Sequence, residues 1–186
     1  MRLNHTLVDF SKPIPKNMPI AHGWFDVRGD GNLSDISGDS LNWVISLSPM
    51  LVLSTPEDLV RWMDALFHQK TVLKEKTLKA MLTFFGPVRH EPMMKGYGLG
   101  VVDINIGALM PKWKDVRCYG HLGSHIGYTT SVAYFPDYGL SVSMMFNRGC
   151  DRGTDRAVAA VTSAVLEKLF QHLGVRESIP KESVSP

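Results

Sequence analysis

The sequence lacks several features that would assign it to a specialised class of protein. Its formal net charge is only +2, so it offers no electrostatic case for binding nucleic acid or an anionic membrane. It has no run of 18 apolar residues, so we expect no membrane-spanning helix. Residues 1–5 carry no apolar signal core, so the chain as given predicts a cytoplasmic protein.

Cysteine is also scarce, because Cys118 and Cys150 are the only two in the sequence. Two cysteines make no disulfide framework, and we expect two small buried side chains, with a single bridge as the alternative. The 186 residues, 44% hydrophobic and 20% charged, predict one soluble globular domain over residues 1–175. Residues 176–186 are polar and contain proline, which predicts a loose tail.

Alternating apolar and polar residues predict an antiparallel sheet of four strands, at residues 97–104, 116–121, 128–135 and 140–147. The last two flank Pro136-Asp137-Tyr138-Gly139, which is typical of a hairpin turn. A shorter strand is expected over residues 20–27, after an irregular proline-containing arm at residues 1–19. The turn that follows contains Asp26, Asp30 and Gly31, but position twelve of a calcium loop would be Ser37 instead of Glu, so we expect a simple turn.

Three helices are expected beside this sheet. Thr55 can cap a helix that begins with Pro56, and a second helix covers residues 74–84. A third covers residues 155–173 and should pack on one face of the sheet. The side chains expected to face the core are Leu59, Trp62, Met63, Leu66, Leu78, Met81, Leu82, Val158, Val161, Val165, Leu169 and Leu173. The predicted class is therefore α/β of the α+β type.

The most informative stretch is residues 117–128, where glycines surround His121 near the expected end of a strand. Glycine within a strand usually marks a close approach of a ligand or another chain segment, so this is the candidate site. His121-Leu122-Gly123 resembles the third motif of the penicillin-recognising serine hydrolases, which include serine β-lactamases, D-alanyl-D-alanine carboxypeptidases and related esterases. The resemblance extends over residues 3–173, through the blocks Ser54-Thr55-Pro56-Glu57-Asp58-Leu59-Val60-Arg61-Trp62, Tyr97-Gly98-Leu99-Gly100, Gly127-Tyr128, Tyr134-Phe135-Pro136-Asp137-Tyr138-Gly139 and Met145-Phe146-Asn147.

The resemblance implies acyl transfer through a serine, with a β-lactamase or transpeptidase-like fold and no cofactor or metal. By position, His121 and Gly123 match the third motif, and Ser124 matches the residue whose backbone N–H faces the oxyanion. Leu122 departs from the common Thr or Ser, which removes a hydroxyl that would hold a substrate carboxylate. A small molecule near His121 is therefore the expected ligand.

The nucleophile of the family belongs to a Ser-x-x-Lys motif at a helix start. Its one occurrence here, Ser178-Ile179-Pro180-Lys181, follows the last expected helix and contains proline. Tyr-x-Asn is absent, and Ser40-Leu41-Asn42 lies downstream of the place where the family has its second motif. The first two catalytic motifs are thus expected to be missing, as in a C-terminal portion of the family.

Other chemistries fit less well. A nucleophile elbow needs glycine two residues before the serine, where Ser124 has Leu122. A zinc pair from His121 and His125 would need that spacing on a helix. Two functions therefore remain: a catalytically incomplete binding or assembly module, and an active serine hydrolase of the carboxypeptidase, β-lactamase or esterase type when complemented by an N-terminal part. Full-length relatives of this kind are commonly exported.

The expected partner is a second copy of the chain. Between Leu140 and Asn147 the predicted strand has no charge and no proline, so a free edge there would offer unpaired backbone groups. The family pairs this strand with an N-terminal strand, and a further helix covers the surface nearby. We expect a dimer through residues 140–147 or through that surface. The alternative is that residues 1–27 fold back and fill the position.

Overall fold

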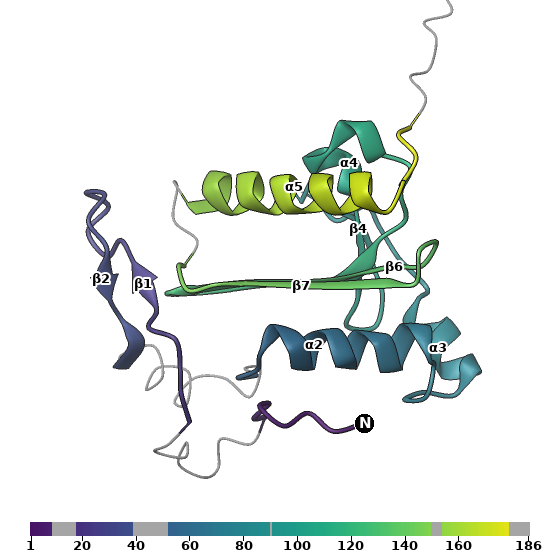
Figure 1. Cartoon of the computed structure of the whole chain (residues 1–186), viewed down its shortest axis with the longest axis horizontal. Helices are drawn as coiled ribbons and strands as arrows, with labels where there is room; N and C mark the ends of the chain where they lie inside the picture. Colours follow the sequence, from purple (N-terminus) through teal and green to yellow (C-terminus); the bar gives the residue numbers. More distant parts are fainter. Residues whose placement is uncertain (9–17, 39–51, 90, 150–153, 179–186) are drawn as a thin grey trace, which may run out of the picture.

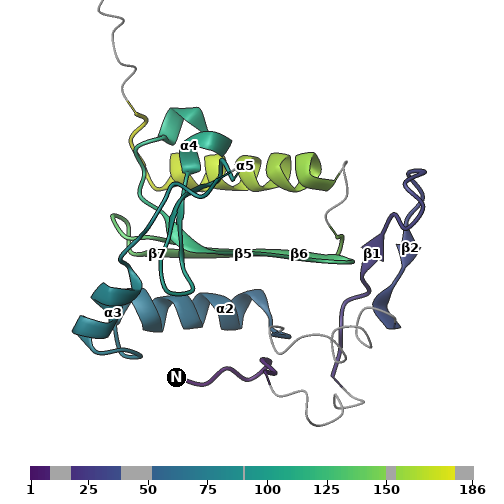
Figure 2. The ribbon, with the colours of Figure 1, turned by 180° about the vertical axis from the view of Figure 1, so that it is seen from behind.

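The computed structural model describes residues 1–8, 18–38, 52–89, 91–149 and 154–178. It has three layers, with α5 (Thr154–His172) on one face of the main sheet and α2 (Pro56–Met63) and α3 (Glu75–Met81) on the other (Figures 1 and 2). This is the expected α+β architecture, with an antiparallel sheet and a C-terminal helix on one face. No helix among the described residues is long and apolar enough to cross a membrane.

The main sheet has five antiparallel strands in the order β3-β4-β5-β6-β7. β6 (Tyr128–Phe135) and β7 (Leu140–Phe146) pair over seven positions, from Thr129 opposite Phe146 to Phe135 opposite Leu140. The expected hairpin at residues 136–139 is therefore confirmed. Consecutive strands are neighbours, so β7 lies at one edge of the sheet.

The strand predicted at residues 97–104 is instead two strands, β3 (Met94–Tyr97) and β4 (Val102–Ile104), which pair with Tyr97 opposite Val102. The four residues between them include Gly98 and Gly100, and Gly100 adopts φ +71, a conformation that favours glycine. Apolar and polar residues alternate on both sides of this turn, so the sequence pattern resembles that of one continuous strand. The sheet consequently has one strand more than the sequence pattern predicted.

The strand predicted to end at His121 is displaced and longer, because β5 covers Tyr119–His125. It pairs with β6 along its whole length and ends in a two-residue turn whose Gly127 has φ +83. Positive φ suits the tight hairpin turn. The glycines that indicated a strand end are therefore held inside the strand by its pairing with β6.

Helix α5 forms where expected, but with a different face toward the sheet. Its buried side chains are Leu166 and Phe170, whereas Val161, Val165 and Leu173 are 49%, 44% and 46% exposed. The prediction that the stripe packs on the sheet was wrong for Val161, Val165 and Leu173, whereas Leu169 does pack against the core. The bulky Phe170 contacts Phe135 and Trp113 and fixes the orientation of the helix in a way that the spacing of the valines does not reveal.

Helix α2 begins as expected, with the Thr55 side chain accepting a hydrogen bond from the Asp58 N–H, and it continues as a π-helical turn, η1 (Asp64–His68). Met63 and Leu66 are buried as predicted. Trp62 is 36% exposed, so its assignment to the core was wrong. The wider turn of η1 buries Ala65, Leu66 and Phe67 in succession, which a regular 3.6-residue period does not anticipate.

Two apolar clusters lie on opposite faces of the sheet. One joins α5 to the sheet through Phe135, Phe170 and Leu166, and includes Trp113 from η2 (Pro111–Trp113), which follows α4 (Ile106–Leu109). The other lies beneath α2, η1 and α3 and contains Met63, Leu66, Phe67, Leu78, Val101 and Tyr134. The sheet is thus covered on both faces, and function must be sought at its edges and strand ends.

A small second sheet pairs β1 (Trp24–Phe25) with β2 (Ser34–Asp35). The expected turn between them is confirmed, because the Asp26 carboxylate accepts hydrogen bonds from the N–H groups of Gly29, Asp30 and Gly31. Only two of the eight residues expected to form a strand at 20–27 do so. These residues meet the end of the main sheet: Trp24 bridges to Arg148 just beyond β7, and the Ala21 and His22 carbonyls accept hydrogen bonds from the side chains of Tyr128 and Asn147.

Asp58 in α2 is fully buried and fastens the N-terminal residues to the helix. Its carboxylate accepts hydrogen bonds from the His5 N–H at 2.8 Å and the Thr6 hydroxyl at 2.9 Å, and Arg61 lies 3.2 Å away. Burial raises the pKa of Asp58, but the hydrogen bonds from His5 and Thr6 and the charge of Arg61 outweigh it. The pKa of Asp58 is therefore below its ordinary value.

We expect Asp58→Asn to remove part of the pH dependence of folding. A lowered folded-state pKa contributes stability above the unfolded-state pKa of about 3.9, and this contribution is lost as the pH falls through the folded value. Urea unfolding at pH 7 and pH 3 should show a smaller difference for Asp58→Asn than for the wild type. Glu57→Gln, at an exposed position of the same helix turn, is the control. An unchanged difference in Asp58→Asn would contradict this prediction.

Candidate functional site

Strand β5 has an open edge next to the third-motif residues. β4 pairs with β5 only at Tyr119 and Gly120, whereas β5 continues to His125. Ile104 donates its N–H to the Cys118 carbonyl, so even-numbered residues of β5 direct their backbone groups toward β4. By this alternation, the backbone N–H and C=O of Leu122 and Ser124 face the edge of β5 beyond the end of β4. An extended ligand would meet these groups there.

His121 is exposed on β5 and is hydrogen-bonded at both ring nitrogens. Nδ1 lies 2.6 Å from the Leu122 carbonyl, and Nε2 lies 2.7 Å from the Tyr97 hydroxyl. A carbonyl can only accept, so Nδ1 carries a proton and donates it to the Leu122 carbonyl. The two contacts hold the His121 ring perpendicular to the Tyr97 ring, with the ring centroids 5.8 Å apart.

The two glycines of this stretch differ in their surroundings. A side chain at Gly120 would place Cβ 2.0 Å from the Val132 carbonyl oxygen, so Gly120 lets the two strands approach. At Gly123 a Cβ would meet only the Thr130 side chain, at 3.8 Å. Gly123 is exposed and is opposite Thr130 in β6. The absence of a side chain at Gly120 therefore allows β5 and β6 to pack closely together. The absence of a side chain at Gly123 leaves an open surface beside His121.

Tyr119 precedes these residues and packs against Phe67 and Tyr134 beneath the sheet. Burial raises the pKa of Tyr119 to about 12, so its phenol stays protonated at neutral pH. A protonated phenol can donate a hydrogen bond but cannot remove a proton from a nucleophile. Tyr119 therefore positions the strand and offers no general base.

His121 and His125 lie on the same face of β5, since four residues of a strand return to the same side. The rise of a strand separates their Cα atoms by about 13 Å. His125 directs Nδ1 to the Ile126 carbonyl at 3.4 Å, away from His121. The strand therefore holds the two rings apart. Among the described residues no group of three His, Cys, Asp or Glu side chains converges on a common point.

The serine of the single Ser-x-x-Lys sequence is engaged elsewhere. The Ser178 hydroxyl accepts a hydrogen bond from the Asp115 N–H at 3.1 Å, and its own N–H donates to the Lys112 carbonyl. Ser178 thus joins the end of the chain to the segment that contains η2. Lys181, and Ser40-Leu41-Asn42, lie outside the described residues.

Cys118 is a buried free thiol, 1% exposed, next to the start of β5. Burial raises the pKa of the Cys118 thiol well above its ordinary value, so the thiol is unreactive at neutral pH. This agrees with the expectation of a small buried side chain at Cys118. Cys150 lies outside the described residues.

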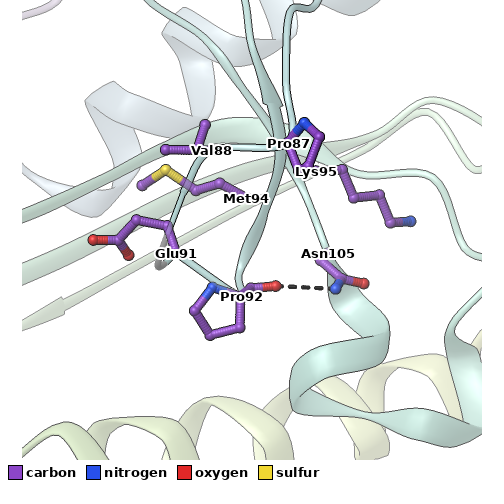
Figure 3. Close-up of a pocket in the computed structure, with 7 residues that line it drawn as sticks. All are labelled: Pro87, Val88, Glu91, Pro92, Met94, Lys95 and Asn105. Carbon is purple, nitrogen blue, oxygen red and sulfur yellow. Dashed lines mark hydrogen bonds between the residues drawn. The ribbon is translucent and has the colours of Figure 1, made fainter.

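An open pocket of about 500 Å³ lies at the far ends of β3 and β4 (Figure 3). Asn105 donates a hydrogen bond to the Pro92 carbonyl across it, and Glu91 and Lys95 supply its charges. The described residues that line the pocket include no histidine, serine or cysteine, and His121 is not among them. The third-motif residues therefore lie on an open strand edge, apart from this pocket.

Sequence reasoning missed Tyr97 as a partner of His121. Tyr97 lies in one of the blocks that carry the family resemblance, but no role was assigned to it. A turn that reverses the chain after Tyr97 brings its hydroxyl within hydrogen-bonding distance of β5. The two glycines after Tyr97 were the available signal, since they indicate a turn as readily as a strand.

Comparisons with known proteins agree with this geometry. The family model described as Beta-lactamase matches residues 23–165. The D-stereospecific amidohydrolase from Streptomyces sp. has a TM-score of 0.64 and 23% identity, covering 85% of this chain and 43% of that one. The D-amino acid amidase from Ochrobactrum anthropi SV3 has a TM-score of 0.66 and 21% identity, covering 89% and 47%. The penicillin binding protein from Bacillus halodurans has a TM-score of 0.55 and 22% identity, covering 85% and 42%.

The chain spans less than half the length of these three solved proteins, and at such identities their likeness shows the fold. No curated protein matches the sequence. The family model alone covers more than half of the chain, including β5 with His121 and Gly123. The chain belongs to the β-lactamase family of penicillin-recognising serine hydrolases.

Proposed function

We propose that this chain is a binding or assembly module of the β-lactamase family that does not catalyse hydrolysis by itself. The observation that carries the proposal is the open edge of β5, which continues past β4 with His121 and Gly123 exposed. The sequence has no Ser-x-x-Lys at the start of a described helix. The geometry supports recognition, because the strand edge supplies backbone hydrogen-bonding groups. Within the described ranges, no serine lies at a helix start with a lysine three residues later, which is the arrangement that activates the nucleophile of this family.

The ligand that fits this edge is a small molecule with an amide or a carboxylate. By the alternation of β5, the Ser124 N–H would donate to a ligand oxygen, and the backbone carbonyls would accept from a ligand N–H. A ligand polar group would compete with Tyr97 for His121 Nε2. The D-amino acid amidase was solved with L-phenylalanine amide, so this compound is the first probe.

Binding is tested by titrating isotopically labelled protein with L-phenylalanine amide and following backbone amide resonances. We expect shifts centred on Leu122 and Ser124, and a three- to tenfold weaker affinity for His121→Ala, as suits the loss of one hydrogen bond. His172→Ala, at the exposed end of α5 on the other face of the sheet, should bind like the wild type. Titration without any shift on β5 would reject the ligand site.

Catalysis is tested with a fluorescent penicillin, a fluorophosphonate and simple ester substrates. We expect no stoichiometric serine adduct and no hydrolysis above a protein blank, because loss of a nucleophile costs many orders of magnitude in rate. The proposal fails if turnover is saturable and disappears in Ser124→Ala or Ser178→Ala.

A second candidate is an active hydrolase complemented by another segment, favoured by the chain's coverage of less than half of each solved relative. That function predicts a fluorophosphonate adduct on a serine of a second polypeptide, formed only when this chain is present. The labelling experiment therefore separates the two candidates.

A further inference from the structure

The open edge of β5 begins at the point where β4 stops pairing. Val102 is opposite Gly120, and by the alternation of β5 the next residue to face this edge is Leu122. β4 supplies no partner there, because the chain turns back toward β3 through a loop in which the Gly98 N–H donates to the Val101 carbonyl. β4 and the open edge therefore form one row beside β5, and a ligand paired with β5 would continue the row that β4 occupies.

The β3–β4 turn, residues 98–101, gives this row a fixed end. The Leu99 N–H donates to the carbonyl of Met81, the last residue of α3, at 3.1 Å. A Cβ at Gly98 would lie 2.3 Å from the same oxygen, so the turn packs tightly against the end of the helix. Its position is thus set by α3, and a ligand on the edge of β5 meets it as a rigid neighbour.

Two aromatic side chains cross the row at the same place. β4 lies between β3 and β5, yet the hydroxyl of Tyr97 in β3 lies 2.7 Å from Nε2 of His121 in β5. The other ring nitrogen of His121 donates to the Leu122 carbonyl, 2.6 Å away, which faces the open edge. The Tyr97–His121 bridge therefore passes across the end of β4 and stands against the first open position of β5.

The other end of the open edge is set by the turn that follows β5. The strand finishes at His125, and a two-residue turn leads into β6. From Leu122 to His125 a strand rises by about 10 Å, the length of three extended residues. Leu122 and Ser124 are the residues of this stretch that direct their backbone groups outward. The open edge therefore matches a ligand of one to three residues.

We propose that Tyr97 is a specificity-determining residue, which restricts the β5 edge to short peptides and amino acid amides and excludes internal segments of longer chains. The proposal rests on the proposed binding function of β5. The Tyr97 side chain is 38% exposed, so the end of a short ligand can lie against its ring. A chain that continues past Leu122 must displace this ring or leave the edge, and it loses strand hydrogen bonds in either case.

The restriction is tested with two probes that carry the same side chain. One is L-phenylalanine amide, and the other is a peptide in which phenylalanine is flanked by several glycines on both sides, with both ends blocked. Titrations of the labelled full chain, followed by backbone amide resonances, give both affinities. The wild type should bind the longer peptide at least tenfold more weakly, as suits the loss of one or two hydrogen bonds.

Tyr97→Ala should reduce this ratio of affinities at least threefold, chiefly by strengthening the binding of the longer peptide. Tyr97→Phe keeps the ring and should keep the wild-type ratio. An unchanged ratio in Tyr97→Ala, or a ratio in Tyr97→Phe as low as in Tyr97→Ala, overturns the proposal. The ratio is the informative quantity, because a general loss of structure would weaken both probes together.

Phe85→Ala is the matched control. Phe85 exchanges backbone hydrogen bonds with Tyr97 on the side of β3 away from β4, and its side chain is 72% exposed. Its removal should leave the ratio unchanged, and an effect as large as that of Tyr97→Ala would contradict the role of Tyr97. Equal binding of both probes to the wild type overturns the length limit alone. A wild type that shows no shift on β5 with either probe overturns the binding function as well.

Discussion

Gly120→Ala is expected to destabilise the protein severely, and Gly123→Ala to leave its folding unchanged. A Cβ at Gly120 would lie 2.0 Å from the Val132 carbonyl oxygen and 2.9 Å from its carbon, both backbone atoms that can move only with β6. Forcing atoms into a packed region costs about 1–3 kcal/mol and sometimes more, and this contact is at the severe end. For a domain of this size, 3 kcal/mol corresponds to a melting temperature lower by roughly 10 °C.

Gly123→Ala is the matched control, because it is three residues along the same strand and would meet Thr130 at an ordinary 3.8 Å. Thermal unfolding of the two variants separates the packing glycine from the site glycine. The same Gly123→Ala protein should bind L-phenylalanine amide more weakly, since its methyl group occupies the open surface beside His121. Equal melting temperatures for the two variants would show that β5 and β6 do not approach as described.

Phe170→Ala is expected to lower the free energy of unfolding by about 3–5 kcal/mol, the usual cost of removing a buried phenylalanine. Phe170 is fully buried, and its ring lies 5.3 Å from Phe135 in β6 and 5.4 Å from Trp113 in η2. It therefore joins the C-terminal helix to the sheet and to the segment after β4. Urea denaturation followed by tryptophan fluorescence measures the loss, with Trp113 as a nearby reporter.

Phe85→Ala provides the control for this substitution, because the same side chain is removed from a site that is 72% exposed. Its effect should stay within about 0.5 kcal/mol, as for most surface substitutions. Similar losses for Phe85→Ala and Phe170→Ala would mean that α5 does not dock through Phe170.

Local sequence patterns determined the elements and the family of this protein. Alternation and the turn residues at 136–139 specify the hairpin of β6 and β7, and Thr55 with Pro56 specifies the start of α2. His121-Leu122-Gly123 and the blocks around it indicated the family before any geometry was known. These signals are readable because turns, caps and strand periods depend on residues that are close together in the chain.

The tertiary structure alone decided which surfaces these elements bury and which they expose. Phe170 turns α5 so that Val161 and Val165 face outward, η1 leaves Trp62 exposed, and pairing with β6 keeps β5 extended through its glycines. The contact between Tyr97 and His121 likewise depends on a turn between two short strands. Each of these outcomes is set by contacts between residues far apart in the sequence, where packing outweighs local preference.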